Sequence, residues 1–297
     1  MDAFFRRQER LLNLETNSTV SVKFDYEFSD YILVNLKIYI PAQNRKQSRL
    51  RITDTLTYNG SYNLVSVVAH QGDSLDAGHY VCYVQTRHGW YLCDDTMSSP
   101  QPVDFADLHQ NDYDPYILLY QRASMALNAR KPTLIGPWRR NNCFLDASMQ
   151  LLFNLPVMEH GLQGPLSSLE ATYSQYKASS STFSINYHRL GYRQAIYGTV
   201  NSQEDPSALL SELLEHPLFA IKEWKVWPDG RKTSNAFYVL LVDWKFILEH
   251  WPKHKVQRVM EQPVEESKYQ ALCNVRFNEA SLGFLGSPFT SLDCIKL

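Results

Sequence analysis

The stretch AHQGDSLDAGHYVCYV, residues 69–84, places a short polar loop and a Gly-His-Tyr triplet directly before an apolar, β-branched run. Residues of this kind in alternation predict a buried strand at 79–85. The strand would hold His79, its first residue, in a fixed orientation, and Gly78 would leave the approach to the ring open. A single histidine is more often an ordinary surface or core residue, but this position makes His79 a candidate functional group.

The same type of pattern continues on both sides of this stretch and predicts a mostly antiparallel sheet. The expected strands are bounded by turn residues such as Asn59-Gly60 and His88-Gly89, and they cover 20–28, 31–40, 62–69, 79–85, 90–93 and 116–121. Ahead of this sheet, residues 4–14 (FFRRQERLLNL) are expected to form a short amphipathic helix.

The spacing of apolar residues changes after a connector at 123–133, which has few bulky apolar side chains. In CFLDASMQLLFNLP, apolar residues recur every three or four positions, which predicts a helix that ends at Pro156. Asp205-Pro206 predicts the start of a second helix, with aspartate as N-cap and proline at the first helical position. Further expected features are a surface loop or frayed helix at 167–184, a turn between two strands at 227–230, and a helical stretch at 242–251.

The composition indicates a globular chain that forms one large domain or two small ones. It has 297 residues, of which 44% are hydrophobic, enough for a substantial core. The net charge of −2 gives no overall field that would attract nucleic acid or an anionic membrane. The longest apolar run, FYVLLV at 237–242, is too short to span a bilayer, and the N-terminal segment lacks the apolar core of a secretory signal.

The cysteine pattern argues against disulfides and against a cysteine-based zinc site. The chain has five cysteines, an odd number, and no C-x-x-C pair. We therefore expect a reducing compartment and no metal or other cofactor. A cytoplasmic location is the matching expectation, which for a pathogen protein would be the cytosol of its host.

Cys143 is the candidate nucleophile because it stands at the predicted start of its helix. Unpaired N–H groups and the positive end of the helix dipole at this position stabilise an anion such as a thiolate. The alternative is a small buried hydrophobic residue, since free cysteine is among the most buried residue types. Thiolate chemistry also needs an imidazole as acid and base, for which His79 is the candidate and His70 its competitor.

Two adjacent aspartates at the end of the strand WYLCDD, Asp94 and Asp95, are candidates for the group that orients the imidazole. If 79–85 and 90–93 pair as a hairpin, the start of one strand lies beside the end of the other. Asp94 would then reach His79, while Asp95 would point to the other side. A solvated turn is the alternative for both.

Several segments resemble parts of one enzyme family, the ubiquitin-specific proteases. Residues 62–122, from YNLVSVVAHQGDSLDAGHYVCYVQ to DPYILLYQR, resemble the family's histidine box, and NNCFLDASMQLLFNLP (141–156) resembles its cysteine box. QEDPSALLSELLEH (203–216) resembles the glutamine-aspartate helix, and YILVNLKIYI (31–40) resembles the strand before the histidine box. These segments together cover about a third of the chain.

The resemblance implies an α+β, papain-like fold with a helical thumb, an antiparallel β palm and reduced fingers. In the family the cysteine box comes first, whereas here the histidine box precedes it, which is the pattern of a circular permutation. The expected single catalytic domain, 1–297, divides into a β palm at 1–122, a connector at 123–133, a helical thumb at 134–220, and fingers with the palm remainder at 221–297.

The resemblance also implies roles for individual residues. Cys143, His79 and Asp94 or Asp95 would form the catalytic set, with Asn141 as an amide donor to the oxyanion. The family's asparagine five residues before the cysteine is replaced here by Trp138, and the glycine three residues before it by Arg140. Loss of one oxyanion donor in a protease costs roughly 3 kcal/mol of transition-state stabilisation. The expected substrate-binding residues are Asp205, Gln203, His70 and Tyr80, with Asp205 facing an arginine of the ubiquitin tail or serving only as a helix cap.

Three functions remain as alternatives at this point. The first is a monomeric cysteine deubiquitinase, which cleaves after the C-terminal glycine of ubiquitin and has ubiquitin or ubiquitinated proteins as partners. The second is a ubiquitin-binding protein with weak or no catalysis, which the changes at Trp138 and Arg140 favour. The third is a papain-like hydrolase or acyltransferase that acts on small peptides, or a papain-like hydrolase that acts on a ubiquitin-like modifier.

Overall fold

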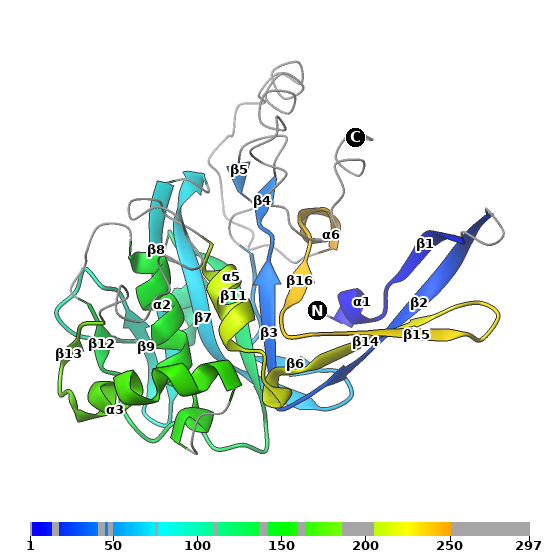
Figure 1. The fold of residues 1–297 in the computed structure, drawn as a ribbon. Helices are drawn as coiled ribbons and strands as arrows, with labels where there is room; N and C mark the ends of the chain where they lie inside the picture. Colours follow the sequence, from blue (N-terminus) through cyan, green and yellow to red (C-terminus); the bar gives the residue numbers. More distant parts are fainter. Residues whose placement is uncertain are drawn as a thin grey trace.

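An eight-stranded sheet lies at the centre of the computed structural model (Figure 1). The residues that the structure describes are 2–13, 18–40, 45–46, 50–74, 77–109, 112–136, 142–159, 164–185 and 205–250. The strands of the central sheet are β3 (Tyr31–Leu36), β6 (Thr55–Thr57), β7 (Ser61–Ser74), β8 (Ala77–Thr86), β9 (Gly89–Cys93), β10 (Gln101–Val103), β11 (Asp114–Arg122) and β16 (Leu240–Val242).

The order along this sheet is β10-β9-β8-β7-β11-β3-β16, and β6 pairs with β7 beside this path. All neighbours are antiparallel except β16 and β3, which are parallel. The prediction of a mostly antiparallel sheet is therefore confirmed. β3 and β11 lie well inside the protein, because every residue of Tyr31–Leu36 and of 114–121 is buried.

Helices cover one face of the central sheet (Figure 1). They are α2 (Cys143–Phe153), α3 (Glu170–Ala178) and α5 (Pro206–Leu213), and α2 packs on β7, β8 and α5. Every residue of α2 is buried, so this helix forms the core between the sheet and the other helices. α5 begins as predicted, with the Asp205 carboxylate accepting a hydrogen bond from the Ser207 N–H at 2.8 Å and Pro206 in the first turn.

A second sheet of four strands projects from the central body as an arm (Figure 1). Its order is β1 (Gln8–Asn13), β2 (Ser18–Phe28), β14 (Ile221–Val226) and β15 (Lys232–Phe237), all antiparallel. The pairing of β2 with β14 joins the N-terminal and C-terminal parts of the chain. The turn predicted at 227–230 lies between β14 and β15, and the predicted C-terminal helical stretch is α6 (Trp244–His250).

The predicted helix at 4–14 is wrong. Only Asp2–Phe5 is helical (α1), and Gln8–Asn13 forms strand β1. The reason is a long-range pairing, in which β1 aligns with β2 from Gln8↔Lys23 to Asn13↔Ser18. Cross-strand hydrogen bonds to β2 outweigh the local helical preference of this segment.

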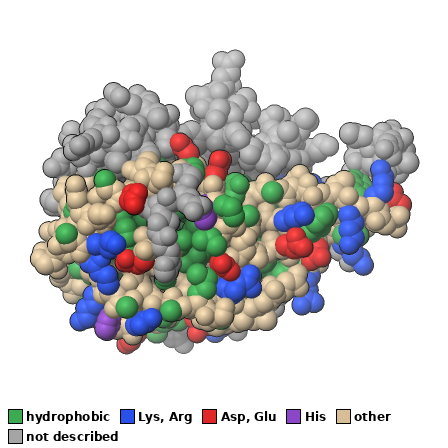
Figure 2. All heavy atoms as spheres, turned by 60° about the horizontal axis from the view of Figure 1, so that its bottom comes forward, with side chains coloured by type: hydrophobic (Ala, Val, Ile, Leu, Met, Phe, Trp, Pro, Cys, Tyr) green, Lys and Arg blue, Asp and Glu red, His purple; other side chains and the backbone are tan. Residues whose placement is uncertain are grey.

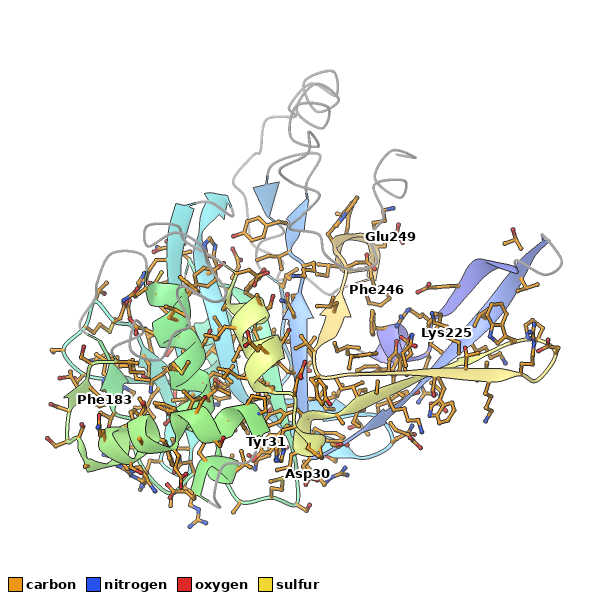
Figure 3. The ribbon with its side chains drawn as sticks, viewed as in Figure 1. Asp30, Tyr31, Phe183, Lys225, Phe246 and Glu249 are labelled. Atoms are coloured by element: carbon orange, nitrogen blue, oxygen red, sulfur yellow. The ribbon has the colours of Figure 1, made fainter. Side chains whose placement is uncertain are left out.

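Aromatic packing and an ion pair between Arg7 and Glu223 hold the strands of the arm together. The Tyr26 hydroxyl donates to the Glu223 carboxylate at 2.7 Å and accepts from Arg7 at 2.5 Å. Phe5 packs against the Tyr26 ring at 5.5 Å between ring centroids. In Figure 3, Lys225 lies in the arm, whereas Asp30 and Tyr31 lie where the arm meets the central sheet.

The remaining elements are short. β4 (Tyr39–Ile40) pairs with β5 (Arg45–Lys46), and β12 (Leu134–Ile135) pairs in parallel with β13 (Thr182–Phe183). The 3-10 helices are Phe105–His109, Pro156–Glu159, Gly164–Leu169 and Pro217–Phe219. The segment predicted as a loop or frayed helix at 167–184 therefore contains the well-formed helix α3. Among the described residues, no helix has the length and apolar character needed to cross a membrane.

The connector predicted at 123–133 is held against the body at several points. The Arg87 N–H donates to the Asn128 carbonyl at 2.9 Å, and His88 Nε2 contacts the Ala129 carbonyl at 3.0 Å. The Asn128 side-chain amide in turn donates to the carbonyl of Asn154, just after α2, at 3.2 Å. The connector thus bridges the turn between β8 and β9 and the end of α2.

Gly78 has a structural role that differs from the one expected. Its φ of +153° is rare for residues with a side chain. A Cβ atom at this position would overlap the carbonyl oxygen of Gln71 and the imidazole ring of His70. The glycine therefore makes room for His70, on the neighbouring strand.

Replacing Gly78 with alanine should destabilise the protein strongly. Backbone strain and steric overlap together predict a loss of at least about 3 kcal/mol in the free energy of unfolding. Gly89→Ala is the matched control, because Gly89 also has a positive φ, +110°, but has no atoms within 4 Å of the added Cβ. Urea denaturation of both variants measures the difference. Equal losses would mean that the contact with His70 is not what requires the glycine.

Candidate active site

The hairpin of β8 and β9 brings His79 to Asp94. The two strands pair with Cys82 opposite Cys93, so the start of β8 lies beside the residues that follow β9. His79 Nε2 and Asp94 Oδ1 are 2.9 Å apart. The hairpin predicted from the sequence is confirmed, together with the juxtaposition that it implied.

Cys143 approaches the same imidazole from the helical layer. It is the first residue of α2, whose packing on β8 sets the helix start over the start of that strand. The Cys143 side chain hydrogen-bonds to His79, and only 4% of the residue is exposed. Asn142 is the N-cap but makes no side-chain capping bond. The imidazole therefore contacts a thiol on one side and a carboxylate on the other.

The surroundings of His79 favour its protonated form. Burial alone would lower its pKa, but the hydrogen bonds to Asp94 and Cys143, with the charges of both groups, raise the pKa of His79 to about 10. An imidazolium at neutral pH beside the sulfur of Cys143 is the partner that a thiolate nucleophile requires.

Asp94 is held by donors that the sequence analysis missed. Its Oδ1 accepts from the Thr96 N–H at 2.9 Å and from Thr96 Oγ1 at 2.7 Å, and its Oδ2 accepts from the Tyr113 hydroxyl at 3.3 Å. Against the opposing effect of burial, the bonds from His79 and Thr96 lower the pKa of Asp94 to about 2. A threonine two residues after an aspartate is a local turn signal, but nothing in the sequence near Tyr113 indicated its contact.

The expectation that Asp95 points away from His79 is wrong. Asp95 Oδ1 lies 3.5 Å from His79 Nε2, and the side chain is 2% exposed. Strand alternation does not apply at this residue because β9 ends at Cys93 and the chain turns, with the Met97 N–H bonded to the Asp94 carbonyl at 2.9 Å. Burial and the charge of Asp94 outweigh the opposing effect of His79 and raise the pKa of Asp95 to about 6.

The donor atoms of His79, Asp94 and Asp95 all lie within 4.8 Å of one another, close enough to hold a metal ion. The hydrogen bond between Nε2 and Oδ1 already accounts for the close approach of the first two. We therefore assign this cluster to acid–base chemistry.

His70 and Tyr80, predicted as substrate-binding residues, are buried in the described structure. His70 is 0% exposed and its Nδ1 lies 2.6 Å from the Tyr39 hydroxyl. Tyr80 is 2% exposed, with its ring 4.5 Å from that of His70. The strand predicted at 62–69 extends further than expected, because β7 continues past His70 to Ser74.

Asp205 is engaged by several protein groups. Besides capping α5, its carboxylate forms an ion pair with Lys37 Nζ at 3.2 Å and accepts a hydrogen bond from the Tyr116 hydroxyl. Against burial, the Lys37 charge and the Ser207 bonds lower the pKa of Asp205. The side chain is 15% exposed. The other predicted site residues, Asn141 and Gln203, lie outside the described residues, as do Trp138 and Arg140.

Comparison with known proteins identifies the part of the chain that carries His79. Residues 9–120 match the family model of the ubiquitin carboxyl-terminal hydrolases. This segment is similar to that family. The fold is accordingly of the papain-like α+β class, as the sequence predicted.

Individual hydrolases of the family match over a similar stretch. The chain is 35% identical over 110 residues to ubiquitin carboxyl-terminal hydrolase 22 of Bos taurus, with 34% of this chain and 20% of that protein covered. It is 34% identical over 91 residues to ubiquitin carboxyl-terminal hydrolase 17-like protein B of Mus musculus, with 30% of this chain and 18% of that protein covered. The chain thus spans about a fifth of the length of these relatives.

The family match covers the histidine and the aspartates of the site but not its cysteine. The matched segment contains His79, Asp94 and Asp95 but ends before Cys143. The assignment of the cysteine therefore depends on the resemblance of 141–156 to the cysteine box and on the contact between Cys143 and His79.

The pKa of His79 can be measured without any activity assay. We expect the imidazole NMR signals of His79 in the native protein to titrate near pH 10. Asp94→Asn removes the charge that favours the imidazolium and should move this titration toward the ordinary value of 6.5. Asp104→Asn, at an exposed aspartate, is the control. If the pKa of His79 is unchanged in Asp94→Asn, Asp94 is not the group that raises it.

Proposed function

We propose that this protein is a cysteine deubiquitinase that hydrolyses the bond after the C-terminal glycine of ubiquitin. The observation that carries the proposal is the contact of Cys143 with His79, because it adds a nucleophile to the histidine and aspartate of the family segment. A free thiol needs a reducing compartment, and we place the activity in the cytoplasm.

In the proposed reaction, Cys143 Sγ attacks the carbonyl carbon of the terminal glycine of ubiquitin. The His79 imidazolium, held by Asp94, then donates its proton to the leaving lysine amine, and an acyl-enzyme thioester remains. Water attacks this thioester with His79 as general base, which releases ubiquitin and restores the thiol. The resemblance assigns Asn141 as one donor to the oxyanion.

We also propose that the chain is a circular permutation of the family domain. The support is the arm, in which β2 of the N-terminal part pairs with β14 of the C-terminal part from Phe28↔Ile221 to Lys23↔Val226. New chain ends in a fingers-like sheet would give this pairing, and the connector at 123–133 would join the old ends.

Lys and Arg side chains and Asp and Glu side chains occur on the same visible face of the protein, without a patch of one sign (Figure 2).

A ubiquitin-binding protein with weak catalysis is the second candidate. Trp138 and Arg140 stand where the family has an asparagine and a glycine, which favours a weakened oxyanion site. A covalent probe separates the two candidates, since it reports on the reactivity of the cysteine with bound ubiquitin.

Ubiquitin with a C-terminal electrophile should form a covalent adduct at Cys143. Intact-protein mass spectrometry should show one added ubiquitin in the wild type and none in Cys143→Ala or His79→Ala. Cys82→Ala is the matched control, because Cys82 is fully buried and burial raises the pKa of its thiol to about 12. Binding without an adduct would favour the second candidate, and an adduct only with a ubiquitin-like electrophile would change the substrate.

The role of Asp205 can be separated from helix capping by two variants. Asp205→Asn keeps an acceptor for the Ser207 N–H but removes the charge. If Asp205 faces an arginine of the ubiquitin tail, this change raises KM several-fold while Tm falls only slightly. Lys37→Met is the control, because it removes the ion-pair partner and leaves the carboxylate. Equal KM values for Asp205→Asn and Lys37→Met would leave Asp205 as a helix cap and ion-pair partner.

A further inference from the structure

Asp95 is a buried carboxylate that lacks the donors its neighbour has. No N–H or hydroxyl group of another described residue donates to either of its side-chain oxygens. Asp94, one position earlier, accepts from Thr96 and Tyr113. An ionised carboxylate with 2% exposure and so few donors carries a substantial desolvation penalty.

The group that faces Asp95 across the site is another carboxyl group. Asp146 lies in the first turn of α2, three residues after Cys143, and only 6% of it is exposed. The carboxyl groups of Asp95 and Asp146 are within hydrogen-bonding reach of each other. Two ionised carboxylates are acceptors only, so such a bond exists only when one of them carries a proton.

Charges from several directions act on this pair. Among the described residues, the ionisable groups near it include His79 of β8, Asp94 beside Asp95, Tyr113 before β11, and Cys143 of α2, which contacts His79. The imidazolium favours ionised Asp95, whereas burial and Asp94 oppose ionisation. The hydrogen bond with Asp146 lowers the pKa of Asp95, as a donor to its ionised form would. Burial and Asp94 have the larger effect, in keeping with a proton retained in the pair above the pH at which a free aspartate loses it.

We propose that Asp95 and Asp146 share one proton, and that Asp146 is a positioning residue that holds Asp95 against the imidazole of His79. The hydrogen bond would link the start of the nucleophile's helix to the turn that carries Asp94. This role rests on the proposed function, because it orients groups for the deubiquitinase reaction. The shared proton itself is a property of the folded protein and can be tested without a substrate.

The stability test uses the sign of the proton linkage. The pKa of Asp95 is raised from 3.8 to about 6 in the folded protein. Between these two pKa values the folded protein holds the proton more tightly than the unfolded chain does. The free energy of unfolding therefore falls as the pH rises through this range. In Asp146→Asn, the amide can donate to ionised Asp95 without a bound proton. Between pH 4 and 7, its Tm should therefore rise relative to wild type by roughly 2–5 °C.

Asp104→Asn is the control for the loss of a carboxylate and should show no such pH-dependent difference, since Asp104 is exposed. Asp95→Asn, which places the amide at the other end of the pair, should reproduce the effect of Asp146→Asn. A Tm difference between Asp146→Asn and wild type that stays constant from pH 4 to 7 would overturn the shared proton.

The positioning role is tested with a fluorogenic ubiquitin C-terminal substrate. Asp146→Leu leaves Asp95 without its partner, and we expect kcat to fall roughly tenfold with little change in KM. Asp146→Asn should recover most of that loss, because it restores a hydrogen bond. Equal losses of kcat in both variants would overturn the positioning role. A wild type inactive on ubiquitin would instead overturn the proposed function, and the Tm comparison would still decide the shared proton.

Discussion

The register of the hairpin formed by β8 and β9 is the constraint on which the candidate site depends. With Cys82 opposite Cys93, His79 and Asp94 come within 2.9 Å at the open end of the hairpin. A slip of one residue would send each side chain to the other face of the sheet and separate the pair. β8 is also an interior strand between β7 and β9, and His79 itself pairs with Gln71 of β7. Since α2 packs on this strand, the thiol of Cys143 is placed in the same rigid frame.

Two adjacent aspartates in this site have different ionisation because their hydrogen-bond partners differ. Hydrogen bonds from His79 and Thr96 hold the pKa of Asp94 near 2. Burial and the negative charge of Asp94 raise the pKa of Asp95 to about 6. Such a separation between neighbouring groups is how a folded chain assigns distinct roles to like side chains. Asp94 is suited to stabilise an imidazolium permanently, while Asp95 can carry or release a proton within the range of ordinary solution pH.

The sequence was sufficient where a signal was local. The hairpin, the start of α2 at Cys143 and the cap of α5 at Asp205 each follow from a few adjacent residues, and the structure confirms them. The segment at 4–14 failed because its strand exists only through pairing with β2. Tyr113 and Asp146 were missed for the same reason, because each reaches the aspartates from an element that is distant in sequence. The orientation of Asp95 was wrong because alternation stops where a strand turns.

Two of the contacts between the halves of the chain help to explain how the site can form with the histidine segment first. At one, the connector residue Asn128 bonds both to Arg87, in the hairpin turn, and to Asn154, after α2. At the other, β2 and β14 form the centre of the arm. Neither contact depends on which half is synthesised first, because both are made between elements already placed by the central sheet. The catalytic geometry is therefore set by packing between layers, and the order of the segments along the chain is free to vary as long as a connection can reach.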